Sequence, residues 1–130
     1  FGPKPIVGAM GRLRSPFNVS SAAQLAGIAA VHDQGYVERV RLHNAKWRDI
    51  AWQRLRGMGL KVGNTFANFV LPEFPTTKGQ TAADADAFLQ TQGIVVRRVE
   101  NYGLPNHLRI TLGDDADMNR VLDALSTFME

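Results

Sequence analysis

The longest periodic pattern of apolar residues runs from residue 36 to residue 58. Mostly apolar or small side chains recur there at alternating steps of three and four, which places them on one face of an α-helix. At 1.5 Å per residue, this amphipathic helix is about 33 Å long. Gly59 follows at the position where glycine often ends a helix. The members of the stripe are Val37, Val40, Asn44, Trp47, Ala51, Leu55 and Met58.

A second helix is predicted over residues 20–33. This segment is apolar on nearly every side and rich in small side chains, so the helix should be buried or tightly crossed. Ser20 or Asn18 is suited to cap its first turn. Residues 1–19 are expected to be mostly loop because of Pro3, Pro5 and Pro16, although the stretch "IVGAMGRL" is compatible with a short helix.

Two more helices are predicted in the second half of the chain. Thr81 and Asp84 have the spacing of a capping box for a helix over residues 82–92, which Gly93 should end. Asp114 can cap the last helix. The apolar stripe of that last helix consists of Met118, Val121, Leu122, Leu125, Phe128 and Met129.

Three short runs predict strands. The first, "FANFVL", is ended by Pro72 and Pro75, and the other two are "GIVVRRV" and "LRITLG". The order of elements predicts an α/β (α+β) fold, with a small sheet of about three or four strands, antiparallel pairing and helices on one face. Residues 1–130 are expected to form a single domain, with about 1–15 as the tail of a preceding element, so that the chain looks like a piece of something longer.

Arginine occupies an unusual place in each of the last two strands. In the second one, Leu108, Ile110 and Leu112 alternate with Arg109, so the arginine should face away from the core. If the two strands form a hairpin centred on Gly103, Arg97 lies directly across from Arg109, because each is six residues from that glycine. Both guanidinium groups would then rise from the same face.

Two positive charges at that spacing need compensation. Directly opposed residues have Cβ atoms roughly 5 Å apart, where unit charges repel by about 3 kcal/mol at an effective dielectric constant of 20. A bound carboxylate or phosphate is one solution, since the arginine fork binds both bidentately. A carboxylate of the chain itself, or a different strand register, is the alternative.

The composition of the chain argues against several other functions. The chain has no cysteine, which excludes disulfides and thiolate chemistry, and its net charge of +3 comes from interspersed acids and bases, so we expect no nucleic-acid partner. The longest apolar run is about half of the roughly 20 residues that a membrane span needs, and a cytoplasmic protein without membrane contact is expected. His32, His43 and His107 lack companions at metal spacing, so no metal site is expected.

Four strings of the sequence occur together in a known family. "RSPFNVSSAAQLAGIAA", "NTFANFVL", "GIVVR" and "LRITLG", in this order and with the long helix between the first two, resemble the C-terminal part of histidinol-phosphate aminotransferases. These are fold-type-I pyridoxal-phosphate enzymes of histidine biosynthesis. The resemblance extends from "FGPKPIVGAM" to the last helix.

The resemblance implies a small domain that closes over an active site built mainly by a larger, N-terminal cofactor domain. It implies that Arg109, in the "LRIT" strand, holds an acidic group of a small amino substrate, and that Arg97 lies in the same substrate region. That group is a phosphate in histidinol phosphate and a carboxylate in glutamate. The family usually works as a homodimer.

The resemblance also implies that the cofactor-binding lysine lies upstream of this region. The lysines present here are expected to be solvated charges, so the 130 residues alone should bind no pyridoxal 5'-phosphate, supply no catalytic residue and lack transaminase activity. Two alternatives stay open: a free-standing, non-catalytic anion-binding module that uses the same arginine pair, and an aminotransferase or decarboxylase acting on another amino acid or amino-phosphate. The lysines are Lys4, Lys46, Lys61 and Lys78.

Overall fold

The computed structural model describes residues 2–14 and 18–130, and the expectation for Pro16 lies outside them. The chain forms two compact units, Phe1–Glu38 and Arg39–Glu130. The single domain expected over residues 1–130 stays a prediction.

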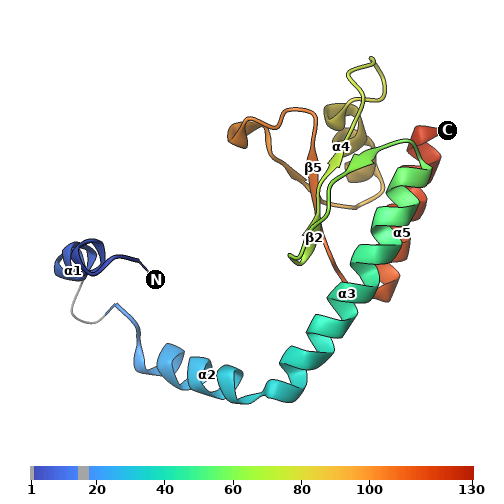
Figure 1. Cartoon of the computed structure of the whole chain (residues 1–130). Coiled ribbons are helices and arrows are strands. Elements are labelled where there is room, and N and C mark those ends of the chain that lie inside the picture. The colour runs from blue at the N-terminus through green and yellow to red at the C-terminus, as the bar shows by residue number, and fades with distance from the viewer. Residues whose placement is uncertain (1, 15–17) are drawn as a thin grey trace. The chain divides into compact units, whose positions relative to one another are not determined.

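The first unit contains helix α1 (Lys4–Leu13) and helix α2 (Ser21–His32), which Figure 1 shows in blue. A helix therefore replaces most of the loop expected near the N-terminus. Pro3 and Pro5 are compatible with it because they lie at its N-cap and in its first turn, where backbone N–H groups have no intrahelical partner. Ser20 caps α2 as predicted, accepting a hydrogen bond from the backbone N–H of Ala23 at 3.2 Å.

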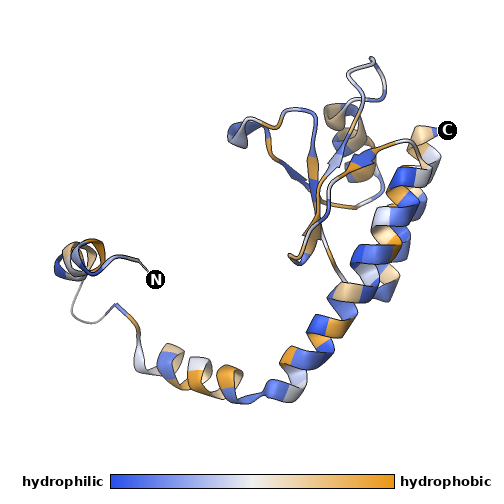
Figure 2. Cartoon of the chain, in the orientation of Figure 1, coloured by the Kyte–Doolittle hydropathy of each residue, from blue (hydrophilic) through white to orange (hydrophobic). Residues whose placement is uncertain are grey.

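The expected burial of α2 is wrong for this chain. No residue of α2 is buried, and the side chain of Leu25 is 70% exposed. Figure 2 shows the hydrophobic residues of this helix in orange. Because every described residue of α1 and α2 is exposed, the first unit has no hydrophobic core of its own. The apolar composition of α2 therefore did not predict its burial.

The second unit holds most of the long helix and all of the strands. Helix α3 (Gln34–Gly57) is followed by β1 (Lys61–Val62), β2 (Phe69–Val70), β3 (Pro72–Glu73), α4 (Ala82–Thr91), β4 (Arg97–Arg98), the 3₁₀ helix η1 (Glu100–Tyr102), β5 (Leu108–Thr111) and α5 (Asp115–Met129). The predicted α/β architecture with antiparallel strands is confirmed.

The sheet is built around β5. A three-stranded antiparallel sheet has the order β2-β5-β4, and β1 pairs with β3 in a separate two-stranded sheet. A single bridge between Glu73 and His107 links β3 to the residue before β5. Both long edges of β5 are therefore hydrogen-bonded, which fixes the position of every side chain along it.

The hydrophobic core lies on one face of this sheet. Leu108 and Ile110 of β5 are buried there against helices α3, α4 and α5. The stripe predicted for α3 is buried only in its C-terminal half, whereas Val37 is 48% exposed. The buried helix residues in this core include Trp47, Ala51, Leu55, Leu89, Met118, Leu122 and Leu125.

Caps fix the ends of the helices around the core. The Thr81 hydroxyl accepts from the backbone N–H of Asp84 at 3.1 Å, and the Asp84 carboxylate accepts from the N–H of Thr81 at 3.1 Å, so the predicted capping box is confirmed. Asp114 caps α5 as expected, accepting from the N–H of Asp117 at 2.8 Å. Gly59 ends α3 with φ at +85°, where the N–H of Leu60 reaches back to the carbonyl of Leu55.

Candidate functional site

Arg97 and Arg109 form a directly opposed pair in the β4–β5 ladder. The two residues are Cα partners, and Arg98 is opposite Leu108 in the next position. This is the register predicted by counting outward from Gly103, whose φ of +77° gives the turn its left-handed backbone.

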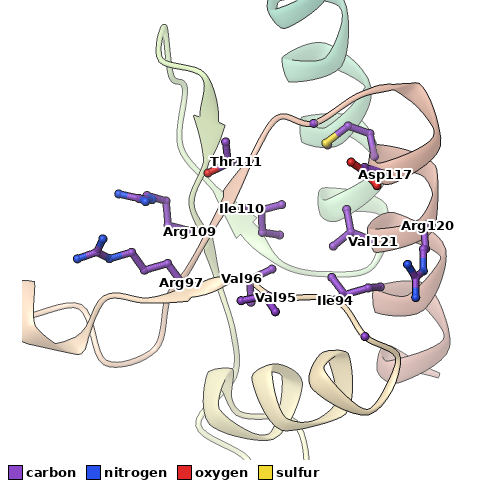
Figure 3. Close-up of a pocket in the computed structure, with 13 residues that line it drawn as sticks. Ile94, Val95, Val96, Arg97, Arg109, Ile110, Thr111, Asp117, Arg120 and Val121 are labelled. Atoms are coloured by element: carbon purple, nitrogen blue, oxygen red, sulfur yellow. The ribbon is translucent and has the colours of Figure 1, made fainter. Parts of the chain in front are cut away.

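The two arginines lie on the face of the sheet opposite the core. Side chains alternate along β5, so that Leu108 and Ile110 are buried while Arg109 is directed outward. Figure 3 shows the side chains of Arg97 and Arg109 extending in the same direction, away from Ile110. The geometric part of the prediction, a pair of guanidinium groups on one face, is confirmed.

Carboxylates do not neutralise this pair within the described residues. Arg98, the neighbour in sequence, forms an ion pair with Glu100 at 2.6 Å, but no such contact is recorded for Arg97 or Arg109 across residues 2–14 and 18–130. The Nε atom of Arg109 is buried and also has no hydrogen-bond partner among these residues. The described part of the chain therefore does not supply the internal counter-charge that the sequence left open.

Two aromatic rings contact the guanidinium groups instead. The Cζ atom of Arg109 lies 5.6 Å from the centre of the Phe69 ring, and that of Arg97 lies 5.9 Å from the centre of the Tyr102 ring. Arg97 Nη2 also donates to the Tyr102 hydroxyl at 3.4 Å. Both distances to the ring centres are within the range of a cation–π contact.

A cleft of about 470 Å³ lies beside the arginines. One wall comes from the segment before β4 and from β5, and the other comes from α5 (Figure 3). Ile94, Val96 and Val121 provide apolar lining, while Asp117 and Arg120 provide charged groups on the helix side. This volume lies in the range of ligand pockets that hold small molecules.

A second charged cluster is structural in character. The buried Trp47 donates its indole N–H to the carboxylate of Asp115 at 2.5 Å, which lowers the pKa of Asp115; the nearby charge of Lys46 lowers it further. His43 Nε2 lies 2.8 Å from the carbonyl oxygen of Gly113. These contacts tie α3 to the start of α5, and of the residues that make them only Gly113 also lines the cleft.

The lysines do not converge on the arginine pair. Lys46 lies 3.4 Å from Asp115 and Lys61 lies 3.8 Å from Glu73, and both are exposed. Lys4 and Lys78 are exposed as well. Within the described ranges, none of the residues that line the cleft is a lysine, and no group of three or more histidine, aspartate or glutamate side chains is placed to hold a metal ion.

The two aromatic contacts were not predicted from the sequence. The sequence places Phe69 in the predicted strand "FANFVL" and Tyr102 next to Gly103, and neither position indicates a contact with an arginine. A partial signal existed for Tyr102, which follows Arg97 by five residues in a short connection. Phe69 becomes a neighbour of Arg109 only through the pairing of β2 with β5, which the sequence did not specify.

Helices of the described residues are also too short or too polar to cross a bilayer; none combines the length and the apolar character that a span needs.

Comparison with known proteins gives one consistent result. The model of the family "Aminotransferase class I and II" matches residues 1–125. Histidinol-phosphate aminotransferase of Rhodopseudomonas palustris (strain TIE-1) is 54% identical over 129 residues, which is 99% of this chain and 35% of that protein. The chain thus spans about a third of the length of the curated relatives it matches.

Solved structures of aminotransferases also resemble this chain. Histidinol-phosphate aminotransferase from Clostridium acetobutylicum superimposes with a TM-score of 0.83 at 27% identity, over 97% of this chain and 38% of that one. The enzyme of the same name from Sinorhizobium meliloti, solved in complex with pyridoxal-5'-phosphate, gives a TM-score of 0.76 at 28% identity, over 93% of this chain and 33% of that one. The chain belongs to the class I and II aminotransferase family.

Proposed function

We propose that this chain is the substrate-anion-binding part of a pyridoxal-phosphate-dependent aminotransferase, namely a histidinol-phosphate aminotransferase of histidine biosynthesis. Arg97 and Arg109 bind the acidic group of the substrate. The observation that carries the proposal is the opposed arginine pair, which lies on an exposed face beside a cleft and has no carboxylate partner among the described residues.

The chemistry of the pair suits a phosphate. Each guanidinium presents N–H donors in a planar fork, and two forks can surround the oxygens of one phosphate or carboxylate. A phosphate dianion removes the repulsion between the two cations, and among the described residues no carboxylate competes for either guanidinium group. A carboxylate, as in glutamate, can use the same donors with half the charge.

The residues of this chain do not fit the cofactor. Covalent attachment of pyridoxal phosphate needs a lysine in the substrate pocket with a partner for the pyridine ring, and among the described residues no lysine lines the cleft beside the arginine pair. We propose that the cofactor is held by a larger domain of a longer polypeptide, in keeping with the 35% coverage of the relatives, and that the enzyme is a homodimer. The 130 residues alone are expected to be inactive.

The test uses the enzyme encoded by the complete reading frame. Its kcat/KM for histidinol phosphate is measured in the wild type and in the variants Arg97→Ala, Arg109→Ala and Arg98→Ala. Loss of one charge-assisted contact should lower kcat/KM by about 10- to 150-fold for either site variant. Arg98→Ala should stay within about threefold, because Arg98 forms its ion pair with Glu100.

Other outcomes would change the assignment. Wild-type kinetics in both site variants would remove the role given to the arginines. Turnover of a different amino-phosphate or amino acid, with histidinol phosphate inert, would keep the enzyme class and change the substrate. A reading frame that begins just before Phe1, with no cofactor segment, would favour the free-standing anion-binding module.

A further inference from the structure

The arginines of this sheet are supported in two different ways. Arg98 is held by a carboxylate, Glu100, at 2.6 Å. Arg97 and Arg109 are each approached by an aromatic ring, and neither forms an ion pair with a carboxylate of the described residues. Arg98, which is not part of the opposed pair, thus has a negatively charged partner, whereas Arg97 and Arg109 have uncharged aromatic partners.

The position of Phe69 follows from the strand register. Phe69 is the partner of Thr111 in the β2–β5 ladder, and Thr111 is two residues from Arg109 on the same face of β5. Phe69 is therefore a diagonal neighbour of Arg109, a separation that an aromatic ring can bridge. The ring centre lies 5.6 Å from the guanidinium carbon.

The position of Tyr102 follows from the tight connection after β4. The backbone N–H of Tyr102 donates to the carbonyl of Val99 at 3.0 Å, and the N–H of Gly103 donates to that of Glu100 at 2.9 Å. This single turn of 3₁₀ helix returns the chain toward Arg97. It places the tyrosine ring 5.9 Å from the guanidinium carbon and the hydroxyl 3.4 Å from Nη2.

We propose that Phe69 and Tyr102 are positioning residues that hold Arg109 and Arg97 without neutralising them. The face of an aromatic ring attracts a cation through its quadrupole and carries no net charge. A carboxylate in the same place would restrain the guanidinium equally well but would compete with the incoming anion. The inference rests on the proposed function, since it concerns the same anion site.

The experiment titrates the 130-residue chain with inorganic phosphate at pH 7.5 and low salt. The probes are the ¹⁵N-labelled Nε–Hε groups of the arginines, which report phosphate affinity and side-chain mobility together. In the wild type, the signals of Arg97 and Arg109 should shift with a common dissociation constant. Arg109→Ala should weaken binding more than tenfold and Arg98→Ala less than twofold, and failure of this arm would count against the proposed function itself.

The aromatic variants test the positioning role separately. Tyr102→Leu and Phe69→Leu should each weaken phosphate binding about two- to fivefold, the size expected for an exposed cation–π contact. The Nε–Hε group of Arg97 should become more mobile in the first variant and that of Arg109 in the second. Tyr102→Phe keeps the ring and should bind within twofold of the wild type. Phe66→Leu changes a ring that is 96% exposed and does not line the cleft, so it is the matched control and should change neither quantity.

A charged variant keeps the test decisive. Tyr102→Glu should restrain Arg97 in an ion pair and weaken phosphate binding more than Tyr102→Leu does. The side chain of Tyr102 is 63% exposed, so these changes leave the core intact, and backbone amide spectra verify this. The inference is overturned if both leucine variants bind phosphate like the wild type with unchanged arginine mobility, or if Tyr102→Glu binds as tightly as Tyr102→Phe.

Discussion

Replacing Arg109 with methionine is expected to stabilise the chain while abolishing the proposed anion site. Methionine keeps an unbranched stem next to Phe69 and removes the cation. It also removes the buried Nε–H of Arg109, which has no hydrogen-bond partner among the described residues. A residue selected for stability alone would not carry these features, so the substitution separates the needs of the site from those of the fold.

The magnitude follows from two unfavourable terms that the substitution removes. Unit charges at the Cβ spacing of opposed residues, about 5 Å, repel by about 0.8 kcal/mol at the dielectric constant of water, and this value is a better guide than that for a lower dielectric constant because Arg97 is exposed. A buried donor without a partner costs about 1–3 kcal/mol. Loss of the cation–π contact with Phe69 offsets about 0.5–1 kcal/mol. The net gain expected in unfolding free energy is about 1–3 kcal/mol.

Urea denaturation followed by tryptophan fluorescence measures this change. Both tryptophans, Trp47 and Trp52, belong to the second compact unit, so the signal reports on the unit that contains the site. The buffer must lack phosphate and sulfate, because a bound anion would stabilise the wild type selectively. The control is Arg98→Met, which breaks the ion pair with Glu100 and should lower the unfolding free energy by up to about 1 kcal/mol.

The adjacent arginines are thus expected to give changes of opposite sign. The part of the gain that comes from repulsion should shrink in 1 M NaCl, where the screening length is about 3 Å. A loss of stability in Arg109→Met as large as in Arg98→Met would refute the reasoning, because it would mean that Arg109 stabilises the fold.

Three further changes test the structure around the site. Leu55→Ala removes a fully buried side chain of α3 and should lower the unfolding free energy by about 2–5 kcal/mol in the same urea assay. Thr81→Ala removes the N-cap of α4 and should cost about 1 kcal/mol, with faster amide exchange in that helix; an unchanged exchange rate would contradict the cap. The Thr81 hydroxyl is also the main cause of the lowered pKa of Asp84, so Asp84 contributes stability above pH 3.8 that is lost as the pH falls through its folded pKa, and this acid-dependent loss should be smaller in the Thr81 variant. Trp47→Phe removes the indole donor and should raise the pKa of Asp115 toward 3.8 in an NMR titration; a pKa that stays low would assign the shift to Lys46 instead.

Local signals predicted the fold where short-range chemistry decides it. The caps at Ser20, Thr81 and Asp114 and the left-handed glycine at Gly59 begin or end helices where expected, since each depends on only a few neighbouring residues. The first helix was less evident, because proline in a first turn resembles proline in a loop. The small β1–β3 sheet was also missed, because two-residue strands leave no periodic pattern.

The site was also predicted only where local sequence patterns determine it. Alternation in β5 and symmetry about Gly103 were enough to oppose Arg97 and Arg109, because a short hairpin has few registers. The contacts of Phe69 and Tyr102 with the arginines depend on strand pairing distant in sequence and on the exact geometry of a turn, which the sequence did not show. Phe69 reaches Arg109 through strands about 40 residues apart, and Tyr102 depends on a single 3₁₀ turn whose sequence also suits an ordinary loop.

The place of each arginine in the sheet gives the pair an unequal character. Arg109 lies in β5, which has a hydrogen-bonded neighbour on either side, whereas Arg97 lies in β4, a two-residue edge strand. Opening the backbone at Arg109 would break its pairing with β4 and disturb the β2 pairing of the adjacent Ile110, but at Arg97 only the β4–β5 ladder is affected. In the proposed anion site, Arg97 should therefore adjust its position to anions of different size, whereas Arg109 should keep its position.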